Sequence, residues 1–145
     1  MSEREMIVRL VLSVVLGGLI GLERQLHKRT AGLRTNMLVC LGSCLIMVLS
    51  LHIYELYRHV ASVDPSRIAA GVITGIGFLG AGAIIRESEN IKGLTTAACL
   101  WVVSAIGLAV GCGFYTAGLV TTALTLAVLF FLRYFERALF DRNPE

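Results

Sequence analysis

The sequence carries little charge and almost no proline for its length. Only 16% of its 145 residues are charged and only two are proline, whereas about a quarter of the residues of a typical soluble domain are charged. The charges gather in short clusters that separate long apolar stretches. This distribution is typical of a polytopic membrane protein and leaves no room for a separate soluble domain beyond a short tail.

The sequence also lacks the common motifs of catalysis. It has no glycine-rich phosphate loop ending in Lys-Ser or Lys-Thr, no H-E-x-x-H motif and no G-x-S-x-G motif. Its four cysteines lie in or beside apolar segments without nearby histidines, and we interpret them as small apolar residues. The net charge of +3 is modest, and the basic residues lie at the ends of the apolar segments. They therefore form no continuous basic patch of the kind that binds nucleic acid. We therefore expect no enzyme, no cofactor, no bound metal and no nucleic-acid partner.

Five apolar runs each have about the length needed to cross roughly 30 Å of hydrocarbon. Because backbone groups in lipid must bond internally, helices are the natural interpretation, and the alternating pattern of a membrane barrel is absent. We predict an all-α polytopic membrane protein of about five transmembrane helices, with residues 1–132 as the transmembrane domain and 133–145 as a short cytoplasmic tail that continues as a helix. The runs are Met6–Leu22, Leu33–Ile53, Ile68–Ile85, Leu94–Val110 and Phe114–Leu132.

The basic residues predict the orientation, because cytoplasmic connections are enriched in lysine and arginine. One side would carry nine of them, in the first and third connections and the tail, and the other side four. We therefore expect the N-terminus outside and the C-terminus in the cytoplasm. Arg9, near the start of the first run, could snorkel to the interface. The two sets are Arg24, Lys28, Arg29, Arg34, Arg86, Lys92, Arg133, Arg137 and Arg142, and Arg4, Arg9, Arg58 and Arg67.

Glycines recur at helical spacing in three of the runs. Small residues four apart let helix backbones approach closely in lipid, which predicts a tight bundle or the seam of a homodimer. A sharper alternative is that residues 76–82 form a broken helix lining a polar cavity, as in transporters. We favour the packing interpretation. The candidate packing glycines are Gly17, Gly21, Gly71, Gly75, Gly77, Gly80, Gly82, Gly107 and Gly111.

Polar residues gather at the helix ends that this topology places in the cytoplasm. Helix N-termini beside arginine or lysine can bind an anion, and the acidic residues could instead pair with those cations or bind a hydrated divalent ion. The simpler interpretation of any one residue is helix capping or an interfacial ion pair. No Asp, Glu or Lys lies in the middle of a run, which counts against a simple ion transporter. The candidate binding residues are Glu23, Arg24, Arg34, Thr35, Asn36, Arg86, Asn90, Thr95 and Thr96.

Four ordered blocks of the sequence, at residues 18–25 (GLIGLERQ), 31–39 (AGLRTNMLV), 75–86 (GIGFLGAGAIIR) and 92–98 (KGLTTAA), resemble the signature blocks of the MgtC/SapB family. The resemblance implies a bacterial inner-membrane protein with a hydrophobic helical domain. Its best-known branch is associated with growth in low magnesium and with virulence, and acts by restraining membrane partners, notably the proton-driven ATP synthase. Longer members carry a C-terminal soluble domain, so the short tail here fits the SapB-like members.

These observations combine into one expected function and one alternative. We expect a non-enzymatic, dimeric membrane protein in magnesium or ion homeostasis, linked to virulence, that acts in the bilayer through other membrane proteins. The alternative is a transporter of ions or small solutes, with a site between the third and fourth helices that opens to the cytoplasm.

Overall fold

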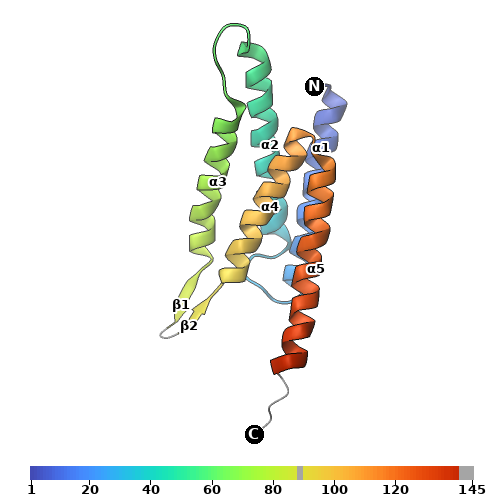
Figure 1. Cartoon of the computed structure of the whole chain (residues 1–145), viewed down its shortest axis with the longest axis vertical. Helices are drawn as coiled ribbons and strands as arrows, with labels where there is room; N and C mark the ends of the chain where they lie inside the picture. The colour runs from blue at the N-terminus through green and yellow to red at the C-terminus, as the bar shows by residue number, and fades with distance from the viewer. Residues whose placement is uncertain (88–89, 141–145) are drawn as a thin grey trace.

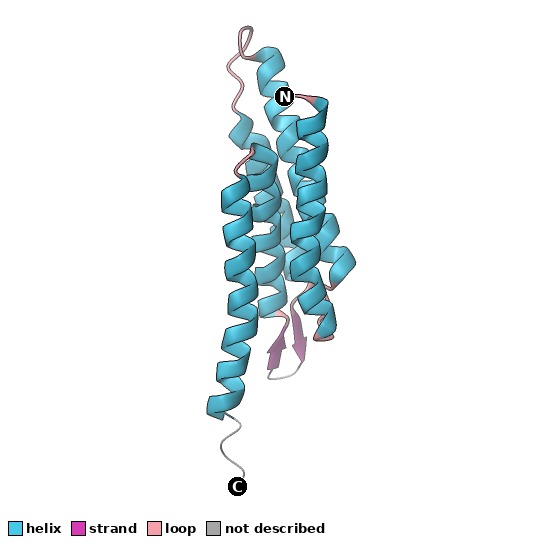
Figure 2. Ribbon diagram, turned by 90° about the vertical axis from the view of Figure 1, so that its right-hand side faces the viewer, coloured by secondary structure: helices cyan, strands magenta, loops and turns pink. Residues whose placement is uncertain are grey.

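Five helices run along one long axis in the computed structural model, which describes residues 1–87 and 90–140 (Figure 1). A short β-hairpin lies at the end of the bundle opposite the N-terminus (Figure 2). The predicted all-α class with about five helices is confirmed. The elements are α1 (Glu3–Leu26), α2 (Leu33–Tyr57), α3 (Pro65–Gly82), β1 (Ile85–Glu87), β2 (Asn90–Lys92), α4 (Leu94–Cys112) and α5 (Tyr115–Phe140).

Three of the helices, α1, α2 and α4, are long and apolar enough to cross a membrane. The apolar part of α5 is shorter, Tyr115–Phe131, and α3 has 18 residues with a polar start. The helix lengths and composition are those of a membrane protein. The number of crossings and the orientation of the termini stay predictions.

The helix ends follow local capping. The Ser2 hydroxyl accepts a hydrogen bond from the Glu5 N–H at 3.2 Å, which starts α1 before its apolar run. The Asp64 carboxylate accepts one from the Ser66 N–H at 2.8 Å, and Pro65 occupies the first turn of α3. The last helix continues to Phe140, as expected from its tail.

The third predicted run is wrong at its C-terminal end. Helix α3 stops at Gly82, and Ile85 pairs with Lys92 in an antiparallel hairpin. Gly93 then turns the chain into α4 with a positive φ of 94°, and a Cβ there would lie 2.0 Å from the carbonyl oxygen of Ala83. Only glycine fits this crossing, so the hairpin brings the end of α3 against the start of α4.

The core lies where α1, α2 and α4 meet. It is built from apolar residues and small thiols with little or no exposure: Leu16, Ile20, Cys40, Cys44, Val48, Val103, Ile106 and Val110. The Ser43 and Ser104 hydroxyls hydrogen bond across it at 2.9 Å. Helix α5 covers α4 and α1, and α3 packs against α4 and α2. Only Ile76 and Gly80 of α3 are buried, so most of α3 lies at the surface of the bundle.

Candidate functional site

A group of buried polar side chains lies at the end of α1 nearest the hairpin. Glu23 and Arg24 are 4% and 5% exposed. The Oε1 atom of Glu23 lies 2.8 Å from His27 Nδ1, and its Oε2 lies 3.7 Å from Arg24 Nη1. Because charges are seldom buried without good pairing, these residues are candidates for a function rather than for stability alone.

Asn36 completes this group from the first turns of α2. Its side chain is fully buried, and its Nδ2 donates to the carbonyl oxygens of Ala31 at 3.0 Å and Gly32 at 2.8 Å. Gly21 of α1 makes room for it, since a Cβ at that position would lie 3.0 Å from the Asn36 Cβ. The close approach of α1 and α2 therefore places Asn36 against the helix that carries Glu23 and Arg24.

We call Glu23, Arg24, His27 and Asn36 the Glu23 cluster. Three of its buried atoms, Glu23 Oε2, Arg24 Nε and Asn36 Oδ1, have no hydrogen-bond partner among the described residues. An unpaired buried polar atom costs about 1–3 kcal/mol, so two acceptors and one donor are available to a polar ligand or to ordered water.

The loop after α1 holds the cluster in place. The N–H of Arg29 donates to the Arg24 carbonyl and that of Lys28 to the Gln25 carbonyl, both at 3.0 Å. This pair of hydrogen bonds is a common C-terminal cap of helices, in which one residue, usually glycine, adopts a left-handed backbone conformation. In α1 that residue is Lys28, with φ 54°. The Gln25 side chain then accepts the Leu33 N–H at 3.2 Å, which ties the end of α1 to the start of α2.

The structure divides the nine predicted site residues into two sets. Four of them are buried between the helices: Glu23, Arg24, Asn36 and Thr96. The other five are exposed at the same end of the molecule: Arg34, Thr35, Arg86, Asn90 and Thr95. His27 and Gln25 were not predicted, although His27 stands four residues after Glu23, a spacing at which helical side chains meet.

Arg9 is buried, which differs from the snorkelling expected of it. Its guanidinium donates to the carbonyl oxygen of Gly111 at 2.6 Å and to the hydroxyl of Tyr115 at 3.3 Å, and it pairs with Glu5. A cation at the C-terminal end of α4 also interacts favourably with the helix dipole. Gly111 and Tyr115 lie more than 100 residues away in the chain, so the local sequence gave no signal for these two partners.

Two adjoining apolar cavities of about 480 Å³ each lie along α3. One is bounded by α3, the start of α2 and Leu100, and the other lies between α2 and α3; both include Leu79. We call them together the α2–α3 groove. Helix α3 is continuous through residues 76–82, so the proposed break there is not present. The cavity near the start of α4 has only two polar side chains, Thr30 and Thr35, in its wall.

The predicted packing glycines also fall into two sets. A Cβ at Gly17, Gly21, Gly107 or Gly111 would lie within 3 Å of a neighbouring helix, and one at Gly80 would touch Ala97 at 3.6 Å. At Gly71, Gly75, Gly77 and Gly82 it would meet no described atom within 4 Å. The first set therefore packs helices within the chain, and the second lies open on α3.

Comparison with known proteins places the chain in a family. Residues 10–138 match the profile of the MgtC family. The chain is 44% identical over 141 residues to YhiD of Escherichia coli (strain K12), which carries the provisional name of a magnesium transporter. It is 46% identical over 121 residues to Protein MgtC of Brucella abortus (strain 2308), and 44% identical over 128 residues to Protein MgtC of Salmonella typhimurium (strain 14028s).

These alignments cover 96%, 82% and 88% of the chain, but only 66%, 48% and 52% of the respective relatives. The chain thus spans about half to two thirds of the length of the curated relatives it matches. No solved structure matches it. Because the family profile covers most of the chain, the chain belongs to the MgtC family.

Proposed function

We propose that this protein is a non-enzymatic, multi-pass protein of the bacterial inner membrane that serves magnesium homeostasis by binding another membrane protein. The magnesium link is supported by the family and by the name of the YhiD relative. The mode of action is supported by the surface of α3.

One observation carries the proposal: α3 has an outer face of small residues against which no other described residue packs. Ala70, Thr74 and Gly77 are exposed, lie on one side of the helix and line neither cavity. The Thr74 hydroxyl donates to the Ala70 carbonyl at 3.1 Å, so its proton needs no hydrogen-bond acceptor from a partner protein. Because helices in lipid associate through small residues, this face suits a transmembrane helix of another protein.

The contrast with the other glycines strengthens this assignment. Every glycine pair of α1 and α4 singled out by the sequence is filled by a neighbouring helix of the same chain. Helix α3 carries glycines at the same spacing, but a Cβ at Gly77 would meet no described atom within 4 Å. We therefore assign the partner to the outer face of α3, with a subunit of the proton-driven ATP synthase as the first candidate and a second copy of the chain as the alternative.

Crosslinking from the outer face tests the proposal. A photoreactive amino acid at position 77 should crosslink to one membrane protein in intact cells, whereas the same amino acid at Ala123, exposed on α5, should not. Gly77→Leu should abolish growth of a deletion strain in low magnesium, and Ala123→Leu should preserve it. Crosslinks only to lipid, together with full growth of Gly77→Leu, would refute a partner on this face; a crosslinked homodimer would identify the partner as a second copy.

Transport of magnesium is a second candidate, favoured by the unpaired buried atoms of the Glu23 cluster. A transport site needs polar atoms that a passing ion can use. Purified protein in proteoliposomes would then carry Mg²⁺ at a rate that saturates, and Glu23→Gln would abolish it. The matched control is Glu55→Gln, whose carboxylate is exposed and pairs with Arg58. Absence of flux from folded wild-type protein would eliminate this candidate and leave the partner-binding proposal.

A further inference from the structure

The charged pair of the Glu23 cluster is buried but incompletely hydrogen-bonded. Glu23 Oε2 and Arg24 Nε have no hydrogen-bond partner among the described residues. The two side chains do not satisfy each other, because Oε2 lies 3.7 Å from Nη1, whereas a charge-assisted hydrogen bond is about 2.8 Å long. A buried ion pair is stable only when its remaining polar atoms are also hydrogen-bonded. A polar group that belongs to neither residue is therefore expected between them.

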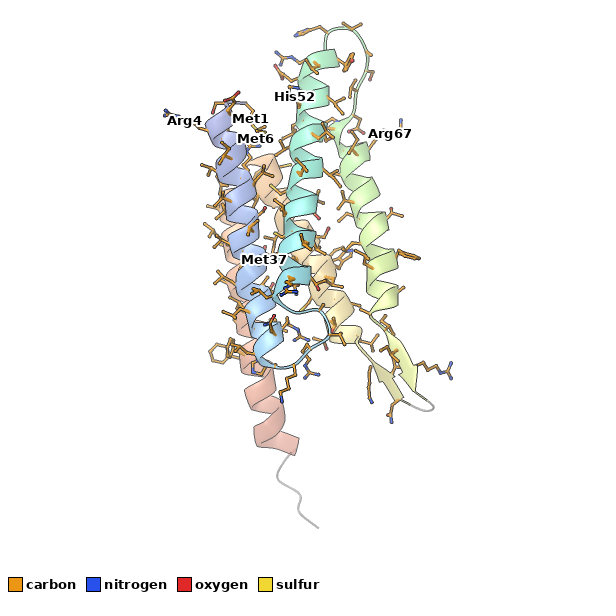
Figure 3. The ribbon with its side chains drawn as sticks, turned by 180° about the vertical axis from the view of Figure 1, so that it is seen from behind. Met1, Arg4, Met6, Met37, His52 and Arg67 are labelled. Atoms are coloured by element: carbon orange, nitrogen blue, oxygen red, sulfur yellow. The ribbon has the colours of Figure 1, made fainter. Side chains whose placement is uncertain are left out.

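Asn36 of α2 brings a third unpaired atom to the same face of α1. Figure 3 shows α1 and α2 side by side at Met37, the next residue in the chain, and a Cβ at Gly21 would lie 3.0 Å from the Asn36 Cβ. Arg24 follows Gly21 by three residues, so the two positions share a face of α1, and a helical side chain lies over the turn that precedes it. The Arg24 side chain therefore extends toward Asn36, whose Oδ1 atom is also unpaired among the described residues.

The three unpaired atoms define the chemistry of the molecule that can bind them. The carboxylate and amide oxygens accept hydrogen bonds, whereas the Arg24 N–H donates one. A bare cation offers this N–H no acceptor and is repelled by the guanidinium, and an anion is repelled by the Glu23 carboxylate. A water molecule can donate two hydrogen bonds and accept one, and about three hydrogen bonds are usual for buried water. The burial of all three side chains favours so small a molecule.

We infer that the Glu23 cluster binds one water molecule, which accepts a hydrogen bond from Arg24 Nε and donates to Glu23 Oε2 and Asn36 Oδ1. The Asn36 amide is fixed from its other side, where Nδ2 donates to the carbonyl oxygens of Ala31 and Gly32. The water thus joins the last turn of α1, the loop after it and the first turn of α2. It occupies the two oxygens that a magnesium ion would use, so the inference also counts against the transport candidate.

Solution NMR of the full-length protein in detergent micelles, with isotope-labelled arginine, tests this site. The Hε proton of Arg24, whose signal is identified by its loss in Arg24→Lys, should receive magnetisation from water through dipolar contact. In a rotating-frame experiment this contact has the opposite sign to chemical exchange with bulk water. Arg4 is the reference for exchange, because it is exposed on the same helix and points away from the bundle (Figure 3).

Two variants of α2 show whether the contact needs Asn36. Asn36→Leu removes the amide oxygen and should abolish the water contact at Arg24 Hε. Ser43→Ala is the matched control, because Ser43 is also buried on α2 but its hydroxyl bonds directly to Ser104. This control should preserve the contact. The wild-type measurement stands by itself if Asn36→Leu does not fold.

Mn²⁺ and inorganic phosphate, added to the same sample, test the other occupants. Mn²⁺ suits the same oxygen ligands as Mg²⁺ and broadens the signals of nearby nuclei. The Glu23 and Asn36 side-chain signals should broaden no more than that of Glu55, whose carboxylate is exposed and pairs with Arg58. Phosphate should leave the Arg24 Hε signal unshifted.

Several results would overturn the inference. Lack of a water contact at Arg24 Hε in the folded wild type would refute the site, and so would a signal of the exchange sign seen at Arg4. Selective broadening by Mn²⁺ that Mg²⁺ reverses would assign the cluster to a divalent cation, and a shift with phosphate would assign it to an anion. A contact that survives in folded Asn36→Leu would refute the three-atom site. None of these results bears on crosslinking from position 77, so this inference and the partner-binding proposal fail separately.

Discussion

The glycines of α1 and α4 and those of α3 have the same spacing in the sequence but opposite surroundings in the structure. In α1 and α4 each paired glycine lies against the backbone of α2, so that a Cβ would fall within 3 Å of a carbonyl oxygen. In α3 a Cβ at Gly71 or Gly75 would meet no described atom within 4 Å. The same residue type therefore closes a core in one region and leaves a surface available for lipid or protein in another.

The largest expected effect comes from a glycine-to-alanine substitution, which adds one methyl group, at one packed and one open glycine. A Cβ at Gly107 would lie 2.3 Å from the Cys40 carbonyl oxygen, so Gly107→Ala must push α4 from α2. We expect a loss of about 3 kcal/mol in the free energy of unfolding. Thermal unfolding in detergent, followed by a dye that reacts with the buried thiols of Cys40 and Cys44 as they become exposed, measures the effect.

Gly75→Ala is the matched control for that variant. Its methyl group enters open space, and alanine is a better helix former than glycine, so the unfolding temperature should stay the same or rise slightly. Equal stability of the two alanine variants would contradict the claim that a methyl group clashes at Gly107 but enters open space at Gly75.

The second prediction concerns the polar contacts that hold the packed region together. Arg9→Ala removes the donor to Gly111 and Tyr115 that joins α1 to α4 and α5. Loss of a buried, charge-assisted hydrogen bond should lower the free energy of unfolding by about 2 kcal/mol. Arg4→Ala removes an exposed arginine from the same helix and should change the unfolding curve little; equal losses in the two variants would contradict the buried role of Arg9.

The smallest expected effect is a difference in acid sensitivity between the N-terminal caps of α3 and α1. The hydroxyl and N–H groups of Ser66 lower the pKa of Asp64. Since the folded pKa lies below the unfolded value, this cap stabilises α3 above the ordinary aspartate pKa of about 3.9 and is lost as the pH falls through the folded pKa. The cap of α1 is the hydroxyl of Ser2, which does not titrate in this range, but Glu5 in the first turn of α1 pairs with Arg9, which lowers the pKa of the Glu5 carboxyl.

Amide hydrogen exchange resolves the two helices. The experiment uses the Glu5→Gln variant, which removes the titrating partner of Arg9 from the first turn of α1. Between pH 6 and about pH 2, after correction for the intrinsic exchange rate, protection of the first turn of α3 should fall in this variant while that of α1 stays unchanged. Asp64→Asn should remove the pH dependence at α3. A parallel loss of protection at the two helices would show that acid loosens the bundle as a whole.

Much of the fold follows from the sequence, because long apolar runs between charge clusters leave few alternatives to membrane helices. Periodicity also gave the face on which Gly17 and Gly21 contact α2. It could not tell which glycines would be filled, since Gly71 and Gly75 have the same spacing and differ only in their neighbours. The hairpin at residues 85–92 was missed because its strands have three residues each, too few to show a period.

The candidate site was predictable only in part. Glu23, Arg24 and Asn36 lie within 13 residues of each other on two helices joined by a short loop, so their place at one end of the bundle was visible in the sequence. The exposed members, Arg34, Arg86 and Asn90, lie at the same end, but tertiary packing decided which side chains entered the bundle. Arg9 shows the same limit, because its partners are brought to it only by the arrangement of α1, α4 and α5.

Helix α3 is held at its two ends, and between them Ile76 is its one buried residue. At its start the Ser50 hydroxyl of α2 donates to the Pro65 carbonyl at 2.6 Å, and at its end Gly80 touches Ala97 and Ala83 crosses Gly93. The separation of α2 and α3 is therefore set by folding itself. Such a cavity is preorganised: an apolar group that enters it does not have to part the helices, so its contacts with the walls contribute to affinity without first offsetting a conformational cost.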